Sequence, residues 1–285
     1  MLDESLRQRL EALNRERISA PAVRPRPTAV APQVPKSRRI DPPHTKQKHH
    51  ALLERGEVVS NPRGTHLMVS LPASELWPDG DSFLQARHEQ LLQSIDFESD
   101  DIRQSFIQAF PSRFVGLDLE TCGLSGSALF LVGVARFHDD RLLVELLFAR
   151  NYAEEASVLC SLSERLAGAE TLVTFNGKSF DWPMVSDRWR RYLLDREAPL
   201  PDLAHYDVLH HARRRWRDTL PDCKLQTIER MICRRSRTCD IAGHMIPGAY
   251  DHYVQTGQTA EMEQVLYHNA VDLVTLVDMA MRLAG

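Results

Sequence analysis

The sequence contains no run of apolar residues that approaches the ~18 needed to span a membrane. Its amino-terminal stretch, MLDESLRQRLEALNRER, has no apolar core of the kind that a secretory signal contains. Cysteine is scarce, and its spacing matches neither a disulfide framework nor a zinc site; the five residues are Cys122, Cys160, Cys223, Cys233 and Cys239. These absences predict a cytoplasmic protein with reduced thiols and no membrane partner.

An excess of positive charge is also missing. The chain has 35 Lys and Arg residues against 39 Asp and Glu residues, with a formal net charge of −4. This balance excludes proteins that bind nucleic acid through bulk charge, as histones do. The length of 285 residues and the 43% hydrophobic content allow one large domain or two small ones.

The first 50 residues differ in charge from the rest of the chain. They hold 11 basic and 5 acidic side chains, a net of +6, which leaves a net of −10 for the other 235 residues. Seven of the 16 prolines also lie there, and proline disfavours regular structure. We therefore predict a disordered, basic, proline-rich tail over residues 1–50. Residues 3–17 could form a short helix within it, and the tail could recruit a protein partner.

Residues 51–110 turn acidic, with 4 basic and 10 acidic side chains. The sequence predicts a strand over 65–71 and helices over 82–95 and 100–110. No residue pattern in this segment indicates chemistry. We expect an amino-terminal extension that packs on the edge of a domain formed by residues 111–285.

An α/β pattern begins near residue 113. Strand patterns cover 113–120, 130–137 and 141–149, and a hairpin-type turn separates the last two. An amphipathic helix over 154–168 and a short strand over 171–175 follow. This order predicts a mixed sheet in which three antiparallel strands are joined by a crossover helix to a parallel fourth strand, with helices on its flanks.

Two carboxylates lie two residues apart in the first of these strands. Asp118 and Glu120 therefore project from the same face of the strand. Carboxylates in a buried strand are costly unless a positive charge compensates them, and Mg²⁺ or Mn²⁺ prefers such oxygen ligands. The alternative is that Leu119 faces the core and both acids face solvent.

Two more acids follow at positions typical of sites. Asp181 comes after the strand over 171–175 and begins a helix predicted over 183–194, where it could be a helix cap or a third metal ligand. Asp272 lies in a long helix predicted over 261–283, four residues after His268. Residues four apart share a helix face, so this pair is either a surface pair or part of a site.

Together these acids form an ordered pattern with a family resemblance. The stretches FVGLDLETCGLSG, LVTFNGKSFDWP and HNAVDLVTL resemble the three motifs of the DEDD superfamily of 3′→5′ exonucleases, which have a ribonuclease-H-like fold. The stretches HYDVLHHARRRW, LPDCKLQTIE and RTCDIAGHMIPGAY make the chain more similar to the bacterial YprB-type ribonuclease-H-like family. The resemblance covers about 113–283.

The resemblance implies hydrolysis of nucleic-acid phosphodiesters with two divalent cations, Mg²⁺ or Mn²⁺. It assigns Asp118 to both cations, Glu120 and Asp272 to the first, and Asp181 to the second. It also implies a partner that is DNA or RNA, held at its 3′ end. His268 would be the general base.

The position of the base departs from the family pattern. The two main classes of the superfamily place His five residues before the last Asp or Tyr four residues before it. This chain has Tyr267 five residues before Asp272 and His268 four residues before it. Because the i,i+4 position faces Asp272 more directly, His268 is favoured, and Tyr267 stays an alternative.

Several polar residues could contact the substrate. Lys178 and Ser179 lie beside Asp181, Arg213 and Arg214 lie in a basic run, and Arg237 opens a loop rich in Gly and Pro. Arginine forks suit phosphate oxygens, although a solvated helix face would have the same composition. Two other functions remain open: a nucleic-acid-binding module with weak or no catalysis, and an interaction protein that recruits a partner.

Overall fold

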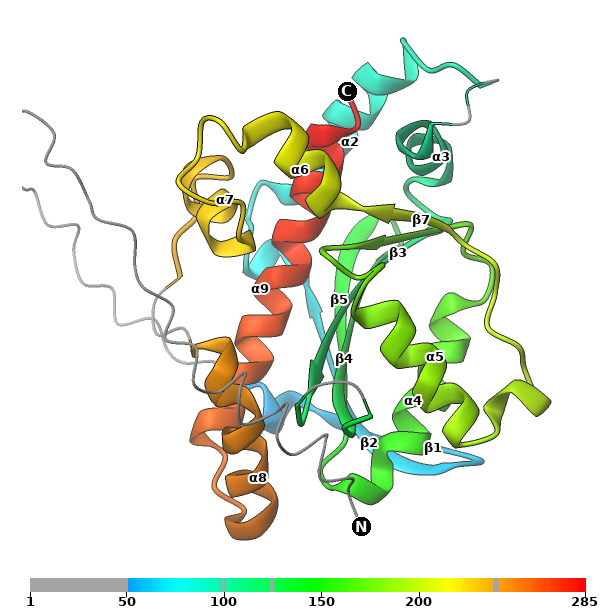
Figure 1. Cartoon of the computed structure of the whole chain (residues 1–285), viewed down its shortest axis with the longest axis vertical. Coiled ribbons are helices and arrows are strands. Elements are labelled where there is room, and N and C mark those ends of the chain that lie inside the picture. The colour runs from blue at the N-terminus through cyan, green and yellow to red at the C-terminus, as the bar shows by residue number, and fades with distance from the viewer. Residues whose placement is uncertain (1–50, 98, 100, 124–125, 238–240) are drawn as a thin grey trace, which may run out of the picture. The chain divides into compact units, whose positions relative to one another are not determined.

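Seven strands form one mixed sheet in the computed structural model, which describes residues 51–97, 99, 101–123, 126–237 and 241–285 (Figure 1). Their order is β1(Glu57–Asn61), β2(Gly64–Pro72), β5(Arg141–Phe148), β4(Leu129–His138), β3(Phe114–Thr121), β6(Thr171–Thr174) and β7(Ala204–Asp207). Strands β3, β4 and β5 are antiparallel neighbours, whereas β6 is parallel to β3. The predicted mixed sheet is confirmed. The predicted tail over 1–50, with its helix over 3–17, lies outside the described residues.

The hairpin between β4 and β5 follows from its two turn residues. His138 pairs with Arg141, so Asp139 and Asp140 alone make the turn. Both have positive φ, 48° and 60°, which is the conformation of the two-residue turn that best matches strand twist. Aspartate tolerates this conformation better than most residues. The predicted turn at this position is confirmed.

Residues 51–110 contribute two strands to the sheet itself, whereas the sequence predicted an extension packed on the edge of the domain. Strand β2 was predicted and pairs antiparallel with β5, and β1, which was not predicted, pairs with β2 and forms the edge. The two predicted helices are present as α2(Gly80–Leu92) and α3(Ile102–Ala109). This segment therefore contributes both strands and helices to the layers of the fold.

Strand β7 was also missed by the sequence analysis. Its four residues pair in parallel with β6 and directly precede α6(Val208–Trp216). Four residues are too few to show an alternating pattern, so only the pairing with β6 identifies the strand.

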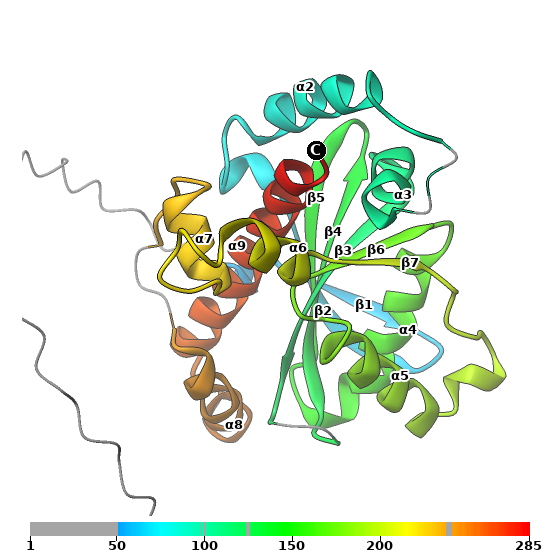
Figure 2. The same ribbon diagram turned by 45° about the horizontal axis from the view of Figure 1, so that its top comes forward.

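Helices cover both faces of the sheet. The remaining ones are α4(Glu155–Leu166), α5(Asp181–Arg191), α6(Val208–Trp216), α7(Leu225–Met231), α8(Ile246–Thr256) and α9(Ala260–Leu283). Figures 1 and 2 show α9 on one face, with α4 and α5 on the other. Of the helices in the described residues, none combines the length and the apolar character that a membrane span requires.

The long helix α9 is buried over most of its circumference. It contacts β3, β4 and β5 on one side, and α2, α6, α7 and α8 on others. The close approach to the sheet depends on Gly133 of β4, because a Cβ there would lie 2.7 Å from Leu273 Cδ1. Helix α9 therefore brings its polar residues directly onto the centre of the sheet.

Candidate active site

Strand β3 directs Asp118 and Glu120 toward α9. A Cβ on Gly116 would lie 3.6 Å from Val277 of α9, and Asp118 Oδ2 accepts a hydrogen bond of 2.7 Å from Asn269 Nδ2. Alternate strand residues share a face, so Glu120 points the same way. Both acids are half-buried and Leu119 is buried, so the alternative in which both acids face open solvent does not hold.

The loop after β6 places Asp181. The side chain of Asp207, at the end of β7, accepts hydrogen bonds from the backbone amides of Asn176 at 2.8 Å and Lys178 at 3.1 Å. It also accepts the amide of Leu209 at 3.2 Å and so caps α6. The loop is thereby held in place, and α5 begins at Asp181, which is only 6% exposed.

Helix α9 supplies three polar residues to the same place. Two of them are the predicted pair, in which His268 Nε2 lies 3.1 Å from Asp272 Oδ2. The third is Asn269, which is fully buried and donates to Asp118. Both members of the predicted pair are buried, so they form part of the interior rather than a surface pair.

The acids are close enough to change one another's protonation. Burial raises the pKa of Asp118 well above its usual range, and Asp272, Glu120 and Asp181 raise it further. Burial raises the pKa of Glu120 to about 8, with His268 acting in the opposite direction. Burial also raises the pKa of Asp181 to about 7, although the backbone amides of Asp181 and Leu119 partly offset the effect. The four predicted acids therefore lie together, where added positive charge would be stabilising.

One positive side chain already lies in this cluster. Arg237 forms an ion pair with Asp272 and donates from Nε to Glu229 Oε2 of α7 at 2.6 Å. Its side chain is 6% exposed. The sequence placed Arg237 on a loop at the substrate, whereas the structure places it among the acids.

Arg237 also contacts His268. A guanidinium nitrogen can only donate, so Nη1 of Arg237 donates to His268 Nδ1 at 3.3 Å. The other ring nitrogen, Nε2, lies 3.1 Å from Asp272 Oδ2. Tyr267 is half-buried and packs against the hydrophobic core. The structure thus places His268 beside Asp272, as the spacing of four residues favoured, while its role as a base stays a prediction.

The donor set suits hard divalent cations, but it is not assembled. The four carboxylates offer the oxygen ligands that Mg²⁺ and Mn²⁺ prefer. Within the part of the chain that the structure describes, no three His, Cys, Asp or Glu side chains have the spacing of a ready ligand set. Arg237 occupies one oxygen of Asp272. In chemical type the residues fit the cations, and a change at Arg237 would be needed to complete the set.

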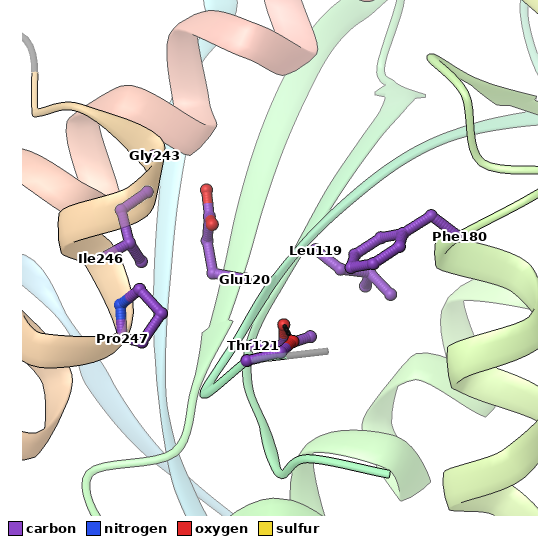
Figure 3. Close-up of a pocket in the computed structure, with 8 residues that line it drawn as sticks. Leu119, Glu120, Thr121, Phe180, Gly243, Ile246 and Pro247 are labelled. Carbon is purple, nitrogen blue, oxygen red and sulfur yellow. Dashed lines mark hydrogen bonds between the residues drawn. The ribbon is translucent and has the colours of Figure 1, made fainter. Parts of the chain in front are cut away.

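An open pocket of about 300 Å³ adjoins the acids at the end of β3. Figure 3 shows Glu120 rising from the strand between Ile246 and Pro247 on one side and Phe180 on the other. Phe180 immediately precedes Asp181 and is 37% exposed. The pocket therefore combines apolar walls with one carboxylate of the cluster.

The remaining predicted contacts lie outside the cluster. Lys178 and Ser179 are exposed on the loop that leads to Asp181, and Arg213 and Arg214 are exposed on α6. Sequence reasoning missed Asn269, although a polar residue on the buried face of a helix between His268 and Asp272 was a usable signal. The hydrogen bonds by which Asp207 holds the loop before Asp181 could not be predicted from the sequence, because they depend on the pairing of β6 with β7.

The acid cluster lies within a region that matches a known protein family. The model of the RNase_H superfamily matches residues 115–284, which include all four acids of the cluster. The chain belongs to the RNase_H superfamily. A relative in Bacillus subtilis (strain 168), the uncharacterized protein YprB, is 36% identical over 166 residues. That match covers 57% of this chain and 40% of YprB, so this RNase_H superfamily chain spans less than half the length of that relative.

Proposed function

We propose that the protein is a metal-dependent nuclease, and most specifically a 3′→5′ exonuclease of the DEDD type. The observation that carries the proposal is the meeting of Asp118, Glu120, Asp181 and Asp272 from β3, α5 and α9 in one cluster. The RNase_H superfamily fold supports nucleic acid as the substrate class.

In this proposal the cluster holds two divalent cations, Mg²⁺ or Mn²⁺. Asp118 would serve both, Glu120 and Asp272 the first, and Asp181 the second. When bound, the cations would supply positive charge to the attacking and leaving oxygens of the phosphodiester. Burial raises the pKa of Glu120 to about 8 and that of Asp181 to about 7, so their ionised forms are disfavoured without a compensating positive charge. This supports a cation site at these residues.

His268 is proposed as the general base that takes a proton from the attacking water. Its Nδ1 accepts from Arg237, so that nitrogen can take a proton only after Arg237 moves away. Substituting His268 with Ala and Tyr267 with Phe separately tests the assignment. Loss of turnover in His268→Ala alone supports it, and loss in Tyr267→Phe alone transfers the role to the phenol.

The pocket beside Glu120 supports action at a strand end. Its walls at Phe180, Ile246 and Pro247 offer an apolar recess next to the acids. A terminal nucleotide would place its base in that recess and its phosphodiester at the carboxylates. Lys178 and Ser179, exposed on the neighbouring loop, are proposed to contact the same strand.

The first experiment tests metal-dependent hydrolysis. The purified full chain is incubated with 5′-labelled DNA and RNA oligonucleotides and Mg²⁺ or Mn²⁺. We expect product ladders that vanish with EDTA and fall at least ~100-fold in Asp118→Asn, because loss of a direct ligand should cost more than loss of its supporting partners. Asp187→Asn, an exposed acid on α5, is the matched control and should retain full activity. Activity that persists in Asp118→Asn would reject the site.

The second experiment tests direction. A linear oligonucleotide with a free 3′ end is compared with one whose 3′ end is blocked and with a circular single strand. A 3′→5′ exonuclease degrades only the first. Cleavage of the circle would replace the exonuclease with an internally cutting nuclease while leaving the metal-dependent chemistry intact.

A nucleic-acid-binding module without catalysis is the second candidate. The ion pair between Arg237 and Asp272 favours it, because it neutralises a proposed ligand with a residue of the chain itself. Oligonucleotide binding without hydrolysis in Mg²⁺ and in Mn²⁺ would select this function.

A further inference from the structure

One segment of residues 51–285, a range that is acidic as a whole, is strongly basic. Residues 213–237 hold nine Lys and Arg against three Asp and Glu, a net of +6. Residues 51–285 as a whole carry a net of −10, so everything in that range outside this segment carries −16. The net charge thus changes sign within 25 residues, so the end of α6, α7 and the chain between them differ electrostatically from the rest of residues 51–285.

Most of these cations are exposed. Arg235 and Arg237 are the inward ones, and they pair with Asp278 and with Asp272 and Glu229. Seven others are exposed and define what we call the α6–α7 basic surface: Arg213, Arg214, Arg215, Arg217, Lys224, Arg230 and Arg234. Among the described residues, only Arg217 of this surface forms an ion pair, in which its Nε lies 3.6 Å from Asp218 Oδ1.

Helix stability alone does not explain the surface. Cations near the carboxyl end of a helix interact well with its dipole, which accounts for part of the run at the end of α6. Lys224, however, is the N-cap of α7, where a cation is unfavourable, and Arg234 lies beyond the end of that helix. The buried residues of α6 are Val208, Leu209 and Ala212, all before the arginine run. The end of α6 therefore presents its cations to solvent without a packing role.

The segment that carries this surface leads into the acid cluster. Helices α6 and α7 both contact α9, and Figures 1 and 2 show them beside it. Glu229 of α7 holds Arg237, and Arg237 reaches Asp272 and His268 of the cluster. The basic segment therefore ends inside the candidate active site.

We propose that the α6–α7 basic surface binds the phosphate backbone of the nucleic-acid strand that is cleaved at the acid cluster. The inference rests on the proposed function for the identity of the ligand. Six of the seven cations are arginines, whose planar forks pair with two phosphate oxygens at once. Backbone contacts carry no base information, so binding is independent of sequence and strongly dependent on salt.

The test compares two variants with the same change in charge. One carries Arg213→Gln, Arg214→Gln and Arg215→Gln on the basic surface. The control carries Arg190→Gln, Arg191→Gln and Arg196→Gln, three exposed arginines on α5 and the turn after it. Binding of fluorescein-labelled 20-mers of deoxythymidine and of uridine is measured by anisotropy in EDTA, between about 50 and 200 mM salt.

The surface variant should bind at least ~10-fold more weakly than the wild type, and its salt slope should fall by roughly 2 for three lost phosphate contacts on a single strand. The control should match the wild type. Equal binding by the two variants would overturn the proposal, whether both retain affinity or both lose it. Lys224→Gln with Arg230→Gln, on α7, provides a second variant should the first not fold.

A small substrate separates this inference from the proposed function. Hydrolysis of thymidine 5′-(p-nitrophenyl phosphate) with Mn²⁺ reports the chemistry on a substrate that lacks the oligonucleotide backbone proposed to bind the basic surface. Weak oligonucleotide binding with intact hydrolysis of the ester supports the surface and the nuclease together. If the wild type hydrolyses neither substrate but binds oligonucleotides through this surface, the proposed function fails and the surface stands.

Discussion

Arg237 forms a buried ion pair with Asp272, the acid that the sequence assigned to metal binding on the last helix. The same guanidinium holds Glu229 and donates to His268 Nδ1. A cation at Asp272 and the guanidinium of Arg237 would compensate the same charge. The two are therefore expected to compete for Asp272.

Replacing Arg237 with Gln should tighten Mn²⁺ binding by about tenfold or more, which equals about 1.4 kcal/mol. The competing positive charge is lost, and Asp272 and Glu229 are left buried without it. Without metal the same variant should lose about 3 kcal/mol of unfolding free energy, since one partner of a buried ion pair has been removed. Calorimetric Mn²⁺ titration and urea unfolding measure the two effects.

Arg235→Gln is the matched control for that variant. Arg235 pairs at 2.7 Å with Asp278, which is fully buried on α9 and outside the acid cluster. It should lose stability in a similar way without gaining affinity for Mn²⁺. Unchanged Mn²⁺ affinity in Arg237→Gln would show that the guanidinium and the metal do not compete.

Asp207 is expected to position the loop that carries Asp181. Asp207→Ala removes three backbone hydrogen bonds to a carboxylate and should cost about 3 kcal/mol of unfolding free energy. Trypsin should also cleave after Lys178 several-fold faster. Asp101→Ala is the control, because Asp101 caps α3 through the amide of Arg103 and holds no such loop. Equal rates of cleavage after Lys178 in the two variants would show that Asp207 caps α6 and does not hold the loop.

Gly133 is expected to be required for the contact between α9 and Asp118. A Cβ at this position would overlap Asn269 Oδ1, and Asn269 is the donor to Asp118. Gly133→Ala should therefore cost about 1–3 kcal/mol in thermal unfolding through overpacking. Gly248→Ala, in α8 with open space around it, should instead gain about 0.5–1 kcal/mol because alanine favours helix. A neutral result at Gly133 would mean that α9 can shift away freely.

His66 is expected to destabilise the fold in acid. It is fully buried in β2, its Nδ1 lies 2.9 Å from Ser157 Oγ, and burial lowers its pKa from 6.5 to about 4. Because the folded pKa is the lower one, the unfolded chain takes up the proton first as pH falls. The stabilisation is complete above about pH 6.5 and is lost as pH falls toward 4.

The measurement is urea unfolding of the wild type and of His66→Gln at pH 7, 5.5 and 4. The advantage of the wild type should shrink by about 3 kcal/mol over this range, as expected for a shift of that size. His138→Gln, whose side chain is 66% exposed, should follow the wild type throughout. A wild-type advantage that stays constant with pH would contradict the effect of burial at His66.

The central part of the fold was predictable because its signals are local. The strands over 113–120, 130–137 and 141–149 are long enough to show their patterns, and the turn residues Asp139 and Asp140 adopt the conformation that the hairpin requires. The edge strands β1 and β7 were missed, since β1 has no buried residue and β7 has only four residues in all. Their pairing comes from partners far away in the chain.

The candidate acids could be identified from local spacing alone, because β3 places Asp118 and Glu120 on one face and α9 places His268 and Asp272 on another. The residues that face these acids are set by tertiary packing. Arg237 meets Asp272, Asn269 meets Asp118, and Asp207 holds the loop before Asp181, all across 31 to 151 residues of chain. Such contacts depend on how α9, α7 and β7 pack against the sheet, and periodicity within one segment carries no information about its packing partners.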